Sequence, residues 1–457
     1  MLLEETRPVT RPNLVVAVLA MGGIVVSLMQ TLVIPLLPRF PQLLGSSPGD
    51  TTWVITSTLL ASAVATPVVG RLGDMYGKRR MLLVSLIMLI LGSVVAALSY
   101  SLLPMIVGRA IQGLAVGVIP LGISIMRDEL PAERLASATA LMSASLGVGG
   151  ALGLPAAAFL AEQSDWHNLF WTSAAAGVIV LIAVLSVVPE SPVRSGGRFD
   201  LLGAAGLSIA LICLLLGVSK ASTWSVSATT GLFVAAAVVL AVWGWWELRT
   251  AQPLVDLRTT ARRQVLLPNI ASAVFAFSMF AQSLVLPQIL QLPTATGHGL
   301  GQSLLVTGLV LVPSGLVMMA TAPVSAKITT ARGPRVTLML GTVVVAVGYG
   351  AGIFMMTAVW HLVVVSAVIG AGIGLAYGSM PALIMSSVPT SETAAANSLN
   401  TLARAIGTST SSAVAGVVLT QVTIPFSFKL IMGLGAATAL LACVVATFIP
   451  RVSRKMP

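Results

Sequence analysis

Long uninterrupted apolar runs are the feature of this sequence that most constrains its fold. Runs of about 20 residues recur along the chain, and each can cross a hydrocarbon layer of about 30 Å as a helix. Only 9% of the residues are charged, and the mean hydropathy is +0.99, whereas roughly 25% are charged in soluble domains. No strand-like alternation accompanies the runs, so helices rather than a barrel are favoured. The sequence therefore predicts an all-α integral membrane protein.

The apolar runs and the polar segments between them predict fourteen membrane spans. The spans cover approximately residues 14–37, 51–70, 81–99, 104–126, 137–161, 169–188, 201–219, 228–246, 265–290, 303–324, 336–357, 361–384, 395–421 and 430–449. Most of the 25 Lys and Arg residues then lie on one side, which the positive-inside rule assigns to the cytoplasm. We expect a multi-pass cell inner membrane protein with both termini cytoplasmic. The charged start, residues 1–13, lacks a signal-peptide cleavage site and is interpreted as a tail.

Several classes of function are disfavoured by the polar residues and their positions. The net charge of +11 comes from basic residues scattered over short loops, so no nucleic-acid partner is expected. Cys213 and Cys443 lie in apolar runs and are interpreted as packing residues. The three histidines, His167, His298 and His361, fall in outside connections, away from any acidic residue within a span. We expect no cofactor and no metal, and an intramembrane enzyme is a remote alternative.

A repeat in the cytoplasmic loops divides the chain into two halves. Pro67, Gly70, Leu72, Asp74, Gly77 and Arg79 are matched at one constant spacing by Pro323, Ala326, Ile328, Thr330, Gly333 and Arg335. The repeat predicts an N-terminal six-helix bundle over residues 1–190 and a C-terminal one over 264–457. Residues 191–263 are then an inserted two-helix pair with its linkers. Two such bundles are a transporter architecture.

The loop after the second span, from Gly70 to Arg80, combines glycines, an aspartate and basic residues. Gly70 and Gly77 permit a close helix approach and a tight reversal, and Asp74 can pair with nearby Arg and Lys residues of the loop, which includes Arg79. An ordinary positive-inside turn would explain the basic residues but not Asp74 and the glycines at this spacing. The loop resembles the inner-loop signature of the major facilitator superfamily, G-x-L-x-D-x-x-G-[RK]-[RK]. The resemblance implies the major facilitator fold and a charge cluster that latches the two bundles shut on the cytoplasmic side.

Two arginines lie within predicted spans, where a cation costs about 2.5–3.5 kcal/mol near the bilayer centre. Arg109 and Gln112 belong to a run that resembles the superfamily's R-x-x-Q-G element, whose arginine is implicated in proton coupling. Alternatively, Arg109 snorkels to the outer end of its span. Arg404 follows Asn397 and Asn400 at helical spacing. The three residues share one polar face, or Arg404 is simply solvated near the inner end.

The fifth span is rich in glycine and contains Pro155. Gly149 and Gly153 form a small-xxx-small face, and the proline leaves a carbonyl unpaired, which is typical of a closely packed, bendable helix. The segment resembles the antiporter signature of exporters in the superfamily, although Ala156 and Ala157 stand where that signature has two glycines. The resemblance implies export, and the alternative is generic packing of membrane helices.

Nearly the whole chain resembles the fourteen-helix drug:proton antiporter branch of the superfamily, in its span count and in the segment 165–167. That branch carries an aspartate in its first span, where this chain has Met29, and an asparagine where it has Ile34. None of the 14 acidic residues lies in the middle of a predicted span. If protons drive transport, a peripheral acid such as Glu162 or Asp128 would titrate.

The same residues bear on the substrate. Missing midplane carboxylates and an aromatic content of only 5% disfavour a lipophilic cation. Arg109 and Arg404 would complement an anion, and a polar, Met-containing cavity would adapt to a neutral solute. The candidates for the cavity lining are Met29, Gln30, Gln282, Gln288, Tyr377, Asn397 and Asn400.

Together these features predict a secondary active transporter that exports small amphiphilic drugs or metabolites by alternating access and proton antiport. Such an exporter would act in multidrug efflux and antibiotic resistance. The alternative on the same fold is a proton-independent facilitator or importer. The expected partners are the amphiphilic substrate, protons and the lipid bilayer, and the protein is expected to be a monomer.

Overall fold

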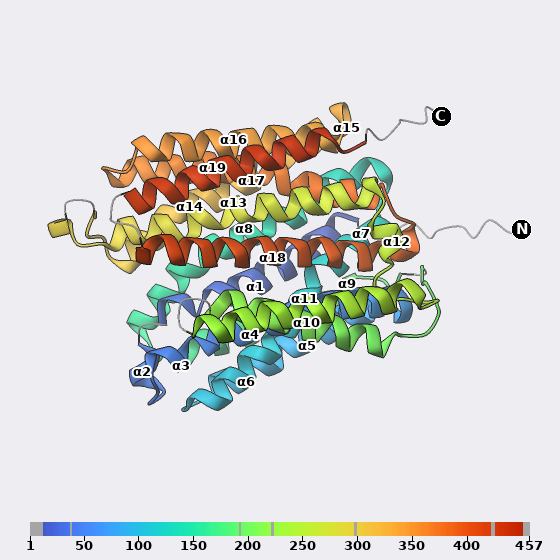
Figure 1. The fold of residues 1–457 in the computed structure, drawn as a ribbon, viewed down its shortest axis with the longest axis horizontal. Coiled ribbons are helices and arrows are strands. Elements are labelled where there is room, and N and C mark those ends of the chain that lie inside the picture. The colour runs from blue at the N-terminus through green and yellow to red at the C-terminus, as the bar shows by residue number, and fades with distance from the viewer. Residues whose placement is uncertain are drawn as a thin grey trace, which may run out of the picture.

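The computed structural model describes residues 12–36, 39–191, 193–220, 224–296, 299–421 and 426–450. In these parts of the chain every regular element is helical, as the apolar runs predicted. The long helices run along the longest axis of the molecule, and the start of α1 and the end of α19 lie at the same end (Figure 1). Thirteen helical segments among the described residues are long and apolar enough to cross a membrane.

The first half is built around α1 (Pro12–Thr31), which packs on α8 (Ala132–Gln163). Next to them lie α4 (Trp53–Tyr76), α5 (Lys78–Ala97) and α9 (Asn168–Val187). The fourth span consists of α6 (Leu102–Gly113), the 3-10 turn η2 (Leu114–Gly117) and α7 (Val118–Glu129). The short elements η1 (Ile34–Leu36), α2 (Phe40–Leu43) and α3 (Pro48–Thr51) connect α1 to α4.

The second half contains α13 (Arg263–Gln291), α14 (Leu304–Ala320), α15 (Ala322–Arg332), α16 (Pro334–Phe354), α17 (Val359–Met385), α18 (Thr393–Gln421) and α19 (Phe426–Thr447). The short elements of this part are α12 (Leu257–Thr260), η3 (Thr294–Thr296) and η4 (Thr390–Glu392). Helix α16 packs on α17 and α19, and α13 packs on α18 and α19. One apolar core, which includes Phe275, Tyr349 and Met432, joins most of these helices.

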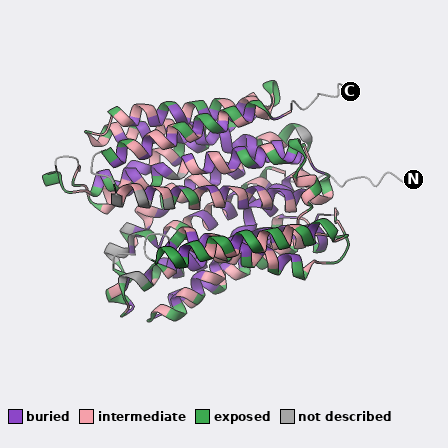
Figure 2. Ribbon diagram, in the orientation of Figure 1, coloured by how far each residue is buried: buried purple, intermediate pink, exposed green. Residues whose placement is uncertain are grey.

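Helices α10 (Leu201–Lys220) and α11 (Val226–Arg249) form a pair between the two halves of the sequence. Helix α10 packs on α4 and α18, through an apolar cluster that includes Ala63, Leu207 and Leu402. Helix α11 packs mainly on α10, and only 6% of its most apolar window is buried; it is largely exposed in Figure 2. The division at residues 190 and 263 stays a prediction.

The two halves meet mainly where α8 packs on α14 and α4 packs on α18, and α8 also contacts α15 and α17 while α7 contacts α18. Helix α18 corresponds to the thirteenth predicted span, but it is not among the thirteen segments that qualify as membrane-crossing. Ser, Thr and Asn side chains recur along its sequence, together with Arg404. Because such side chains are unfavourable against lipid, α18 is suited to a position between other helices, and Figure 1 shows it across the middle of the molecule.

The predicted repeat has a structural counterpart at the turns before α5 and α16. Gly77 (φ 118°) and Gly333 (φ 88°) both have left-handed backbone conformations that favour glycine. Two residues further on, Arg79 donates to the carbonyl of Leu185, near the end of α9. Arg335 likewise donates to the carbonyl of Ile449, just after α19. In each half, therefore, the arginine at the equivalent position fixes the turn to the end of a later helix: Arg79 to α9 and Arg335 to α19.

Candidate transport site and cytoplasmic gate

Asp74, near the end of α4, is completely buried and connects the two halves of the chain. Its carboxylate accepts hydrogen bonds from the backbone N–H groups of Ala394 (3.1 Å) and Ala395 (2.8 Å), in the first turn of α18. A helix N-terminus has unpaired N–H groups and partial positive charge, which favour a carboxylate by about 0.3–1 kcal/mol. Gly70 permits this close approach, because a Cβ there would lie 2.3 Å from Ser398 Oγ.

Lys78, the first residue of α5, is also completely buried and lies between two carboxylates. Its Nζ lies 2.5 Å from Asp128 Oδ2 and 3.9 Å from Asp74 Oδ1. Asp128 also accepts a hydrogen bond from the Ser191 hydroxyl. Further hydrogen bonds offset the cost of burying an ion pair. Asp128 Oδ2 accepts two of them, whereas Asp128 Oδ1 has no partner among the described residues.

Arg127, at the end of α7, makes a second contact between the halves. Its guanidinium donates to Thr393 Oγ1, at the start of α18, at 2.7 Å. It also donates to the carbonyl of Val388, in the segment that leads to α18, at 3.0 Å. The sequence counted Arg127 only as one of the basic residues of the cytoplasmic side. We name the contacts of Asp74, Lys78, Asp128 and Arg127 with each other and with α18 the cytoplasmic gate, because the sequence predicts that this side faces the cytoplasm. In this structure these contacts hold α4 and α7 against the start of α18.

Arg79, one of the basic residues of this loop, does not pair with Asp74. Its backbone N–H donates to Glu190 Oε1 (3.2 Å) and its side chain donates to the carbonyl of Leu185 (2.8 Å), so it acts within the first half. Gly77 is required at the turn both by its φ and by space, because a Cβ there would lie 2.7 Å from Glu190 Oε1. The cation of this loop that faces Asp74 is Lys78.

Arg109, in α6, is 1% exposed and turns into the first half rather than toward the surface. Its Nη1 donates to Gln112 Oε1 at 2.7 Å and to the backbone oxygen of Met29 at 3.3 Å. Its Nε donates to the backbone oxygen of Val54 at 3.3 Å. None of the ion pairs among the described residues includes Arg109. The buried guanidinium is therefore held by neutral acceptors alone.

Gln112, one turn after Arg109, is buried and fixed by a serine. Its Nε2 donates to Ser93 Oγ at 2.7 Å, and the Ser93 hydroxyl donates to the carbonyl of Leu89 at 2.7 Å. These two hydrogen bonds leave the amide oxygen of Gln112 facing Arg109. Because Gln112 and Ser93 each have partners in this hydrogen-bond series, they define the position of the Arg109 guanidinium.

Arg404, in α18, lies over an aromatic ring rather than beside a carboxylate. The guanidinium carbon is 4.7 Å from the centroid of the Tyr377 ring in α17, and Nη2 donates to Thr401 Oγ1 at 3.1 Å. The Nε atom is buried without a hydrogen-bond partner among the described residues. Arg404 is 9% exposed, and the described ion pairs do not include it. A cation stacked on an aromatic face can still attract an anion from its open side.

Asn397 and Asn400 do not bond to Arg404, although all three lie in α18. The amide of Asn397 donates to a carbonyl one turn earlier in its own helix, at 2.9 Å. The amide of Asn400 donates to Asn269 Oδ1 (3.0 Å) and Ser272 Oγ (2.9 Å), so it joins α18 to α13. Asn400 thus joins two helices, Asn397 bonds within α18, and Arg404 meets Tyr377 instead.

The predicted glutamines occupy different environments. Gln282 is buried in α13, where its Nε2 donates to Ser314 Oγ at 3.2 Å, while its Oε1 has no partner in the described parts of the chain. Gln30, next to the buried Met29, is exposed, and so is Gln288. The structure brings Arg109 together with Met29 and Gln112, and Arg404 with Tyr377, but it does not join these two groups.

The glycine-rich segment of α8 contacts helices from both halves. A Cβ on Gly149 would lie 2.4 Å from the backbone oxygen of Ile24 in α1, so the two helices are in close contact there. Gly153 approaches α1 in the same way. On the other side, a Cβ on Gly308 of α14 would lie 2.9 Å from the backbone nitrogen of Pro155. Helix α8 is therefore packed against both α1 and α14.

The remaining acids and histidines lie away from these groups. Asp128 belongs to the gate, and the side chain of Glu162 is outside the described residues, as is His298. In the loop before α9, the backbone N–H and ring of His167 hold the pKa of the Asp165 carboxyl below its usual range. No cluster of three or more possible metal ligands occurs in the part of the chain that the structure describes.

Comparison with protein families gives one match, the Major Facilitator Superfamily, whose model aligns with residues 19–412 and 269–457. The chain belongs to the major facilitator superfamily. Members of this superfamily are multi-pass membrane transporters rather than enzymes. Membership in the fourteen-helix branch stays a prediction.

Curated relatives with similar sequences include resistance and export proteins. The multidrug resistance protein B homolog of Mycobacterium tuberculosis is 27% identical over 67% of this chain. That match covers 56% of the relative, little more than half of its length. The tetracenomycin C resistance and export protein of Streptomyces glaucescens is 28% identical over 90% of this chain and 76% of the relative.

Solved structures share the fold at low sequence identity. The human organic anion transporter MFSD10 superposes with a TM-score of 0.69 at 16% identity, covering 95% of this chain and 99% of that one. The proton:xylose symporter XylE gives a TM-score of 0.67 at 14% identity, with 96% of each chain covered.

Proposed function

We propose that this protein exports small amphiphilic molecules, anionic or neutral, by alternating access. The observation that carries the proposal is that Arg109 and Arg404 are embedded cations without a carboxylate partner among the described residues. In a medium of low dielectric constant, such a charge attracts an anionic group and repels a lipophilic cation. Arg404 is the more exposed of the two, so it is the better candidate for direct contact with substrate, with Tyr377 beside it.

Export rather than import is supported by α8 and by the relatives. The segment with Gly149, Gly153 and Pro155 packs against α1 and α14, one in each half, so a bend in α8 would change how the halves meet. Relatives whose names state multidrug resistance or export, at 27% and 28% identity, support the same direction. Drugs or secondary metabolites are accordingly the proposed substrates.

Alternating access would use the cytoplasmic gate. The contacts of Asp74 and Arg127 with the start of α18 close one end of the molecule, and their separation would open a path from the cytoplasm. The halves then rock about a site near the midplane. We further propose that residues 1–190 and 264–457 are the moving bundles, with 191–263 inserted between them.

The energy source is proposed to be proton antiport, with Arg109 responding to protonation or substrate. Met29 removes the first-span acid through which the fourteen-helix branch would couple, so a peripheral acid such as Asp128 or Glu162 would carry the proton. The alternative is a proton-independent facilitator or importer, which the neutral surroundings of Arg109 favour. We place the protein in the cell inner membrane as a monomer with cytoplasmic termini.

The test is efflux from proteoliposomes of matched anionic, neutral and cationic amphiphiles, with and without an imposed pH gradient. Wild type is compared with Arg109→Ala and Arg404→Gln. Gradient-driven export of anionic and neutral probes, lost in Arg109→Ala, is the expected result. Equilibration that ignores the gradient would identify a facilitator, and preferential transport of cations would overturn the proposed substrate class.

A further inference from the structure

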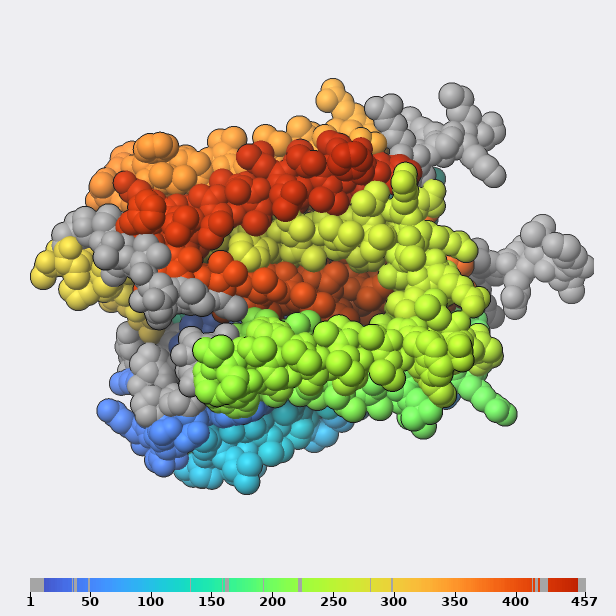
Figure 3. Space-filling model, viewed as in Figure 1, coloured from blue at the N-terminus to red at the C-terminus, as the bar shows by residue number. Residues whose placement is uncertain are grey.

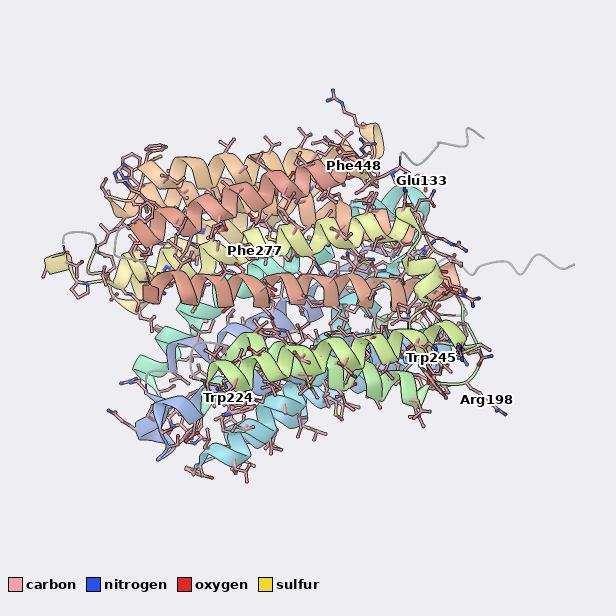
Figure 4. The ribbon with its side chains drawn as sticks, viewed as in Figure 1. Glu133, Arg198, Trp224, Trp245, Phe277 and Phe448 are labelled. Atoms are coloured by element: carbon pink, nitrogen blue, oxygen red, sulfur yellow. The ribbon has the colours of Figure 1, made fainter. Side chains whose placement is uncertain are left out.

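The inserted helix pair contains a buried carboxylate that the transport model does not use. Helix α11 is largely exposed, and its buried residues are Thr229, Ala236 and Glu247. Glu247 lies near the end of the helix, and it is only 2% exposed. Figure 4 shows the neighbouring Trp245 at one end of the pair and Trp224 at the other. A helix that exposes its apolar residues and buries a glutamate is unusual, because burial of an ionised carboxylate is strongly unfavourable.

Among the described residues, Glu247 has neither a completed hydrogen bond nor an ion pair that would stabilise its ionised form. Both of its carboxylate oxygens are buried without a hydrogen-bond partner among the described residues. The backbone N–H groups of Leu254 and Val255 and the indole N–H of Trp243 are close, but none of them completes a hydrogen bond to either oxygen. A protonated carboxyl group carries no net charge and is the form that suits this environment.

A second carboxylate, that of Asp200, faces Glu247 from the start of α10. An ideal Cβ on Gly203 would lie 2.4 Å from Asp200 Oδ2 and 2.6 Å from Glu247 Oε1, so the two oxygens flank one point of α10. Asp200 accepts hydrogen bonds from the Gly203 N–H (2.8 Å) and from Trp246 Nε1 (3.2 Å). Two adjacent carboxylates do not both ionise easily, and of these two only Asp200 accepts completed hydrogen bonds. The proton therefore belongs on Glu247.

The charged side chains of the surrounding elements are engaged elsewhere. Arg249 of α11 lies over the Trp245 ring at 4.2 Å, and Arg258 of α12 donates to the carbonyl of Leu248. Arg71 of α4 donates to Ser195 Oγ at 3.4 Å. Asp256, the remaining acid of this segment, accepts bonds from Arg258 and Thr259. No described ion pair includes Glu247 or Asp200.

The segment that follows Glu247 reaches the cytoplasmic gate. Residues 251–256 line a pocket of about 220 Å³ together with Pro67 and Arg71 of α4 and with Ala395 and Leu399 of α18. Figure 3 shows the chain between α11 and α13 crossing from the inserted pair to the second half at this end of the molecule. The segment thus spans the same α4–α18 contact that Asp74 closes, and its Leu254 and Val255 face Glu247.

We propose that Glu247 and Asp200 form a proton-binding carboxyl pair that holds one proton, on Glu247, at neutral pH and keeps residues 251–256 docked over the closed gate. On release, the Glu247 O–H bond breaks and the proton passes to cytoplasmic water, leaving two neighbouring carboxylates. Their repulsion separates the end of α11 from α10 and loosens the segment. The proton binding does not depend on the proposed function, whereas an effect on export rests on it.

Infrared spectroscopy of the reconstituted full-length protein tests the proton binding without any transport. At neutral pH we expect a carboxylic-acid C=O band that shifts in D2O and is lost in Glu247→Gln. The band is retained in Asp200→Asn, because Asp200 is the ionised partner. Glu133→Gln is the control: Glu133 is an exposed carboxylate in the first turn of α8, at the same end of the molecule (Figure 4). A band that survives Glu247→Gln, or is lost in Asp200→Asn, would overturn the assignment.

The link to the gate is tested by spin labels at the exposed Tyr76 and Thr390, one on each side of the α4–α18 contact. Raising the pH is expected to widen the label separation in the wild type and in Glu133→Gln, but not in Glu247→Gln, which keeps a neutral side chain at every pH. An equal response in Glu247→Gln would refute the link even if the infrared band is assigned correctly. The wild type and the variants could all fail to export while the infrared band and the label separations change as expected. That result would contradict the proposed function and leave the assignment of the proton to Glu247 intact.

Discussion

Arg109 Nη1 lies 3.3 Å from the backbone oxygen of Met29 and 3.5 Å from its sulfur. Met29 is the position that aligns with the first-span aspartate of the fourteen-helix antiporters. The most buried arginine of the first half therefore faces a thioether, which is a weak acceptor, where that branch would offer a carboxylate. The positive charge of this region is left without a counter-charge from the described protein residues.

Replacing Met29 with aspartate is expected to supply the missing counter-charge. The new carboxylate would pair with Arg109 and could bind and release a proton, so export by Met29→Asp should depend more steeply on the pH gradient. The apparent affinity for anionic probes should fall about tenfold, because a charged hydrogen bond contributes about 1.5–3 kcal/mol. Met29→Leu is the control of similar volume. Identical gradient dependence in Met29→Asp and Met29→Leu would argue against this role.

The helices could be predicted from the sequence because lipid exposure imposes long apolar runs, and the Gly70–Arg80 loop because its residues carry local turn and charge requirements. The partners of these residues could not. Asp74 bonds to the start of α18, more than 300 positions later, and only the folded chain brings them together. The sequence offered several basic residues of the loop as partners of Asp74, and only the fold shows that Lys78 faces Asp74 while Arg79 binds the carbonyl of Leu185 in α9.

The burial of individual polar side chains was the second property that could not be predicted from the sequence. Glu247 lies close to the end of an apolar run, where an acid usually reaches water, and nothing local indicates that α10 covers it. The polar residues of α18 suggested a shared face for Asn397, Asn400 and Arg404. In the structure Asn397 bonds within α18, Asn400 bonds to α13 and Arg404 lies over Tyr377 of α17, and the last two partners depend on which helices pack against α18.

Arg404→Gln is expected to weaken binding of anionic substrates selectively. The variant removes the charge and leaves Tyr377 in place, so the apparent KM for an anionic amphiphile should rise about tenfold while that for a neutral analogue stays within about twofold. Arg404→Lys keeps the charge but loses the flat stacking on the ring, and it should lie between the two. Equal losses for anionic and neutral probes would assign Arg404 a structural role. Initial rates in proteoliposomes give these constants.

Asp74→Asn is expected to shift the molecule toward an open cytoplasmic end. Asparagine keeps an acceptor for one of the two α18 N–H groups but loses the negative charge, at a cost of about 1–2 kcal/mol to the closed state. The ratio of open to closed molecules should rise roughly 5–30-fold. Distances between spin labels at Tyr76 and Thr390 measure this ratio, with Glu133→Gln as the control. A distance distribution like that of the wild type would mean that Asp74 does not hold the gate.

The gate also depends on the close approach of α4 and α18, which Gly70→Ala tests with no change of charge. A Cβ at residue 70 would lie 2.3 Å from Ser398 Oγ and 2.8 Å from the backbone oxygen of Ala394. Ser398 can rotate away, but a backbone oxygen closer than 3.0 Å cannot be relieved without moving the helices apart. We expect a cytoplasmic end that stays open and export reduced about tenfold or more, because the closed state contributes to every cycle.

Gly231→Ala is the matched control, since an added Cβ there meets nothing within 4 Å and replaces a helical glycine of exposed α11. That variant should export normally and gain about 0.5–1 kcal/mol in stability. If Gly70→Ala closes and exports like Gly231→Ala, the α4–α18 contact is not the gate.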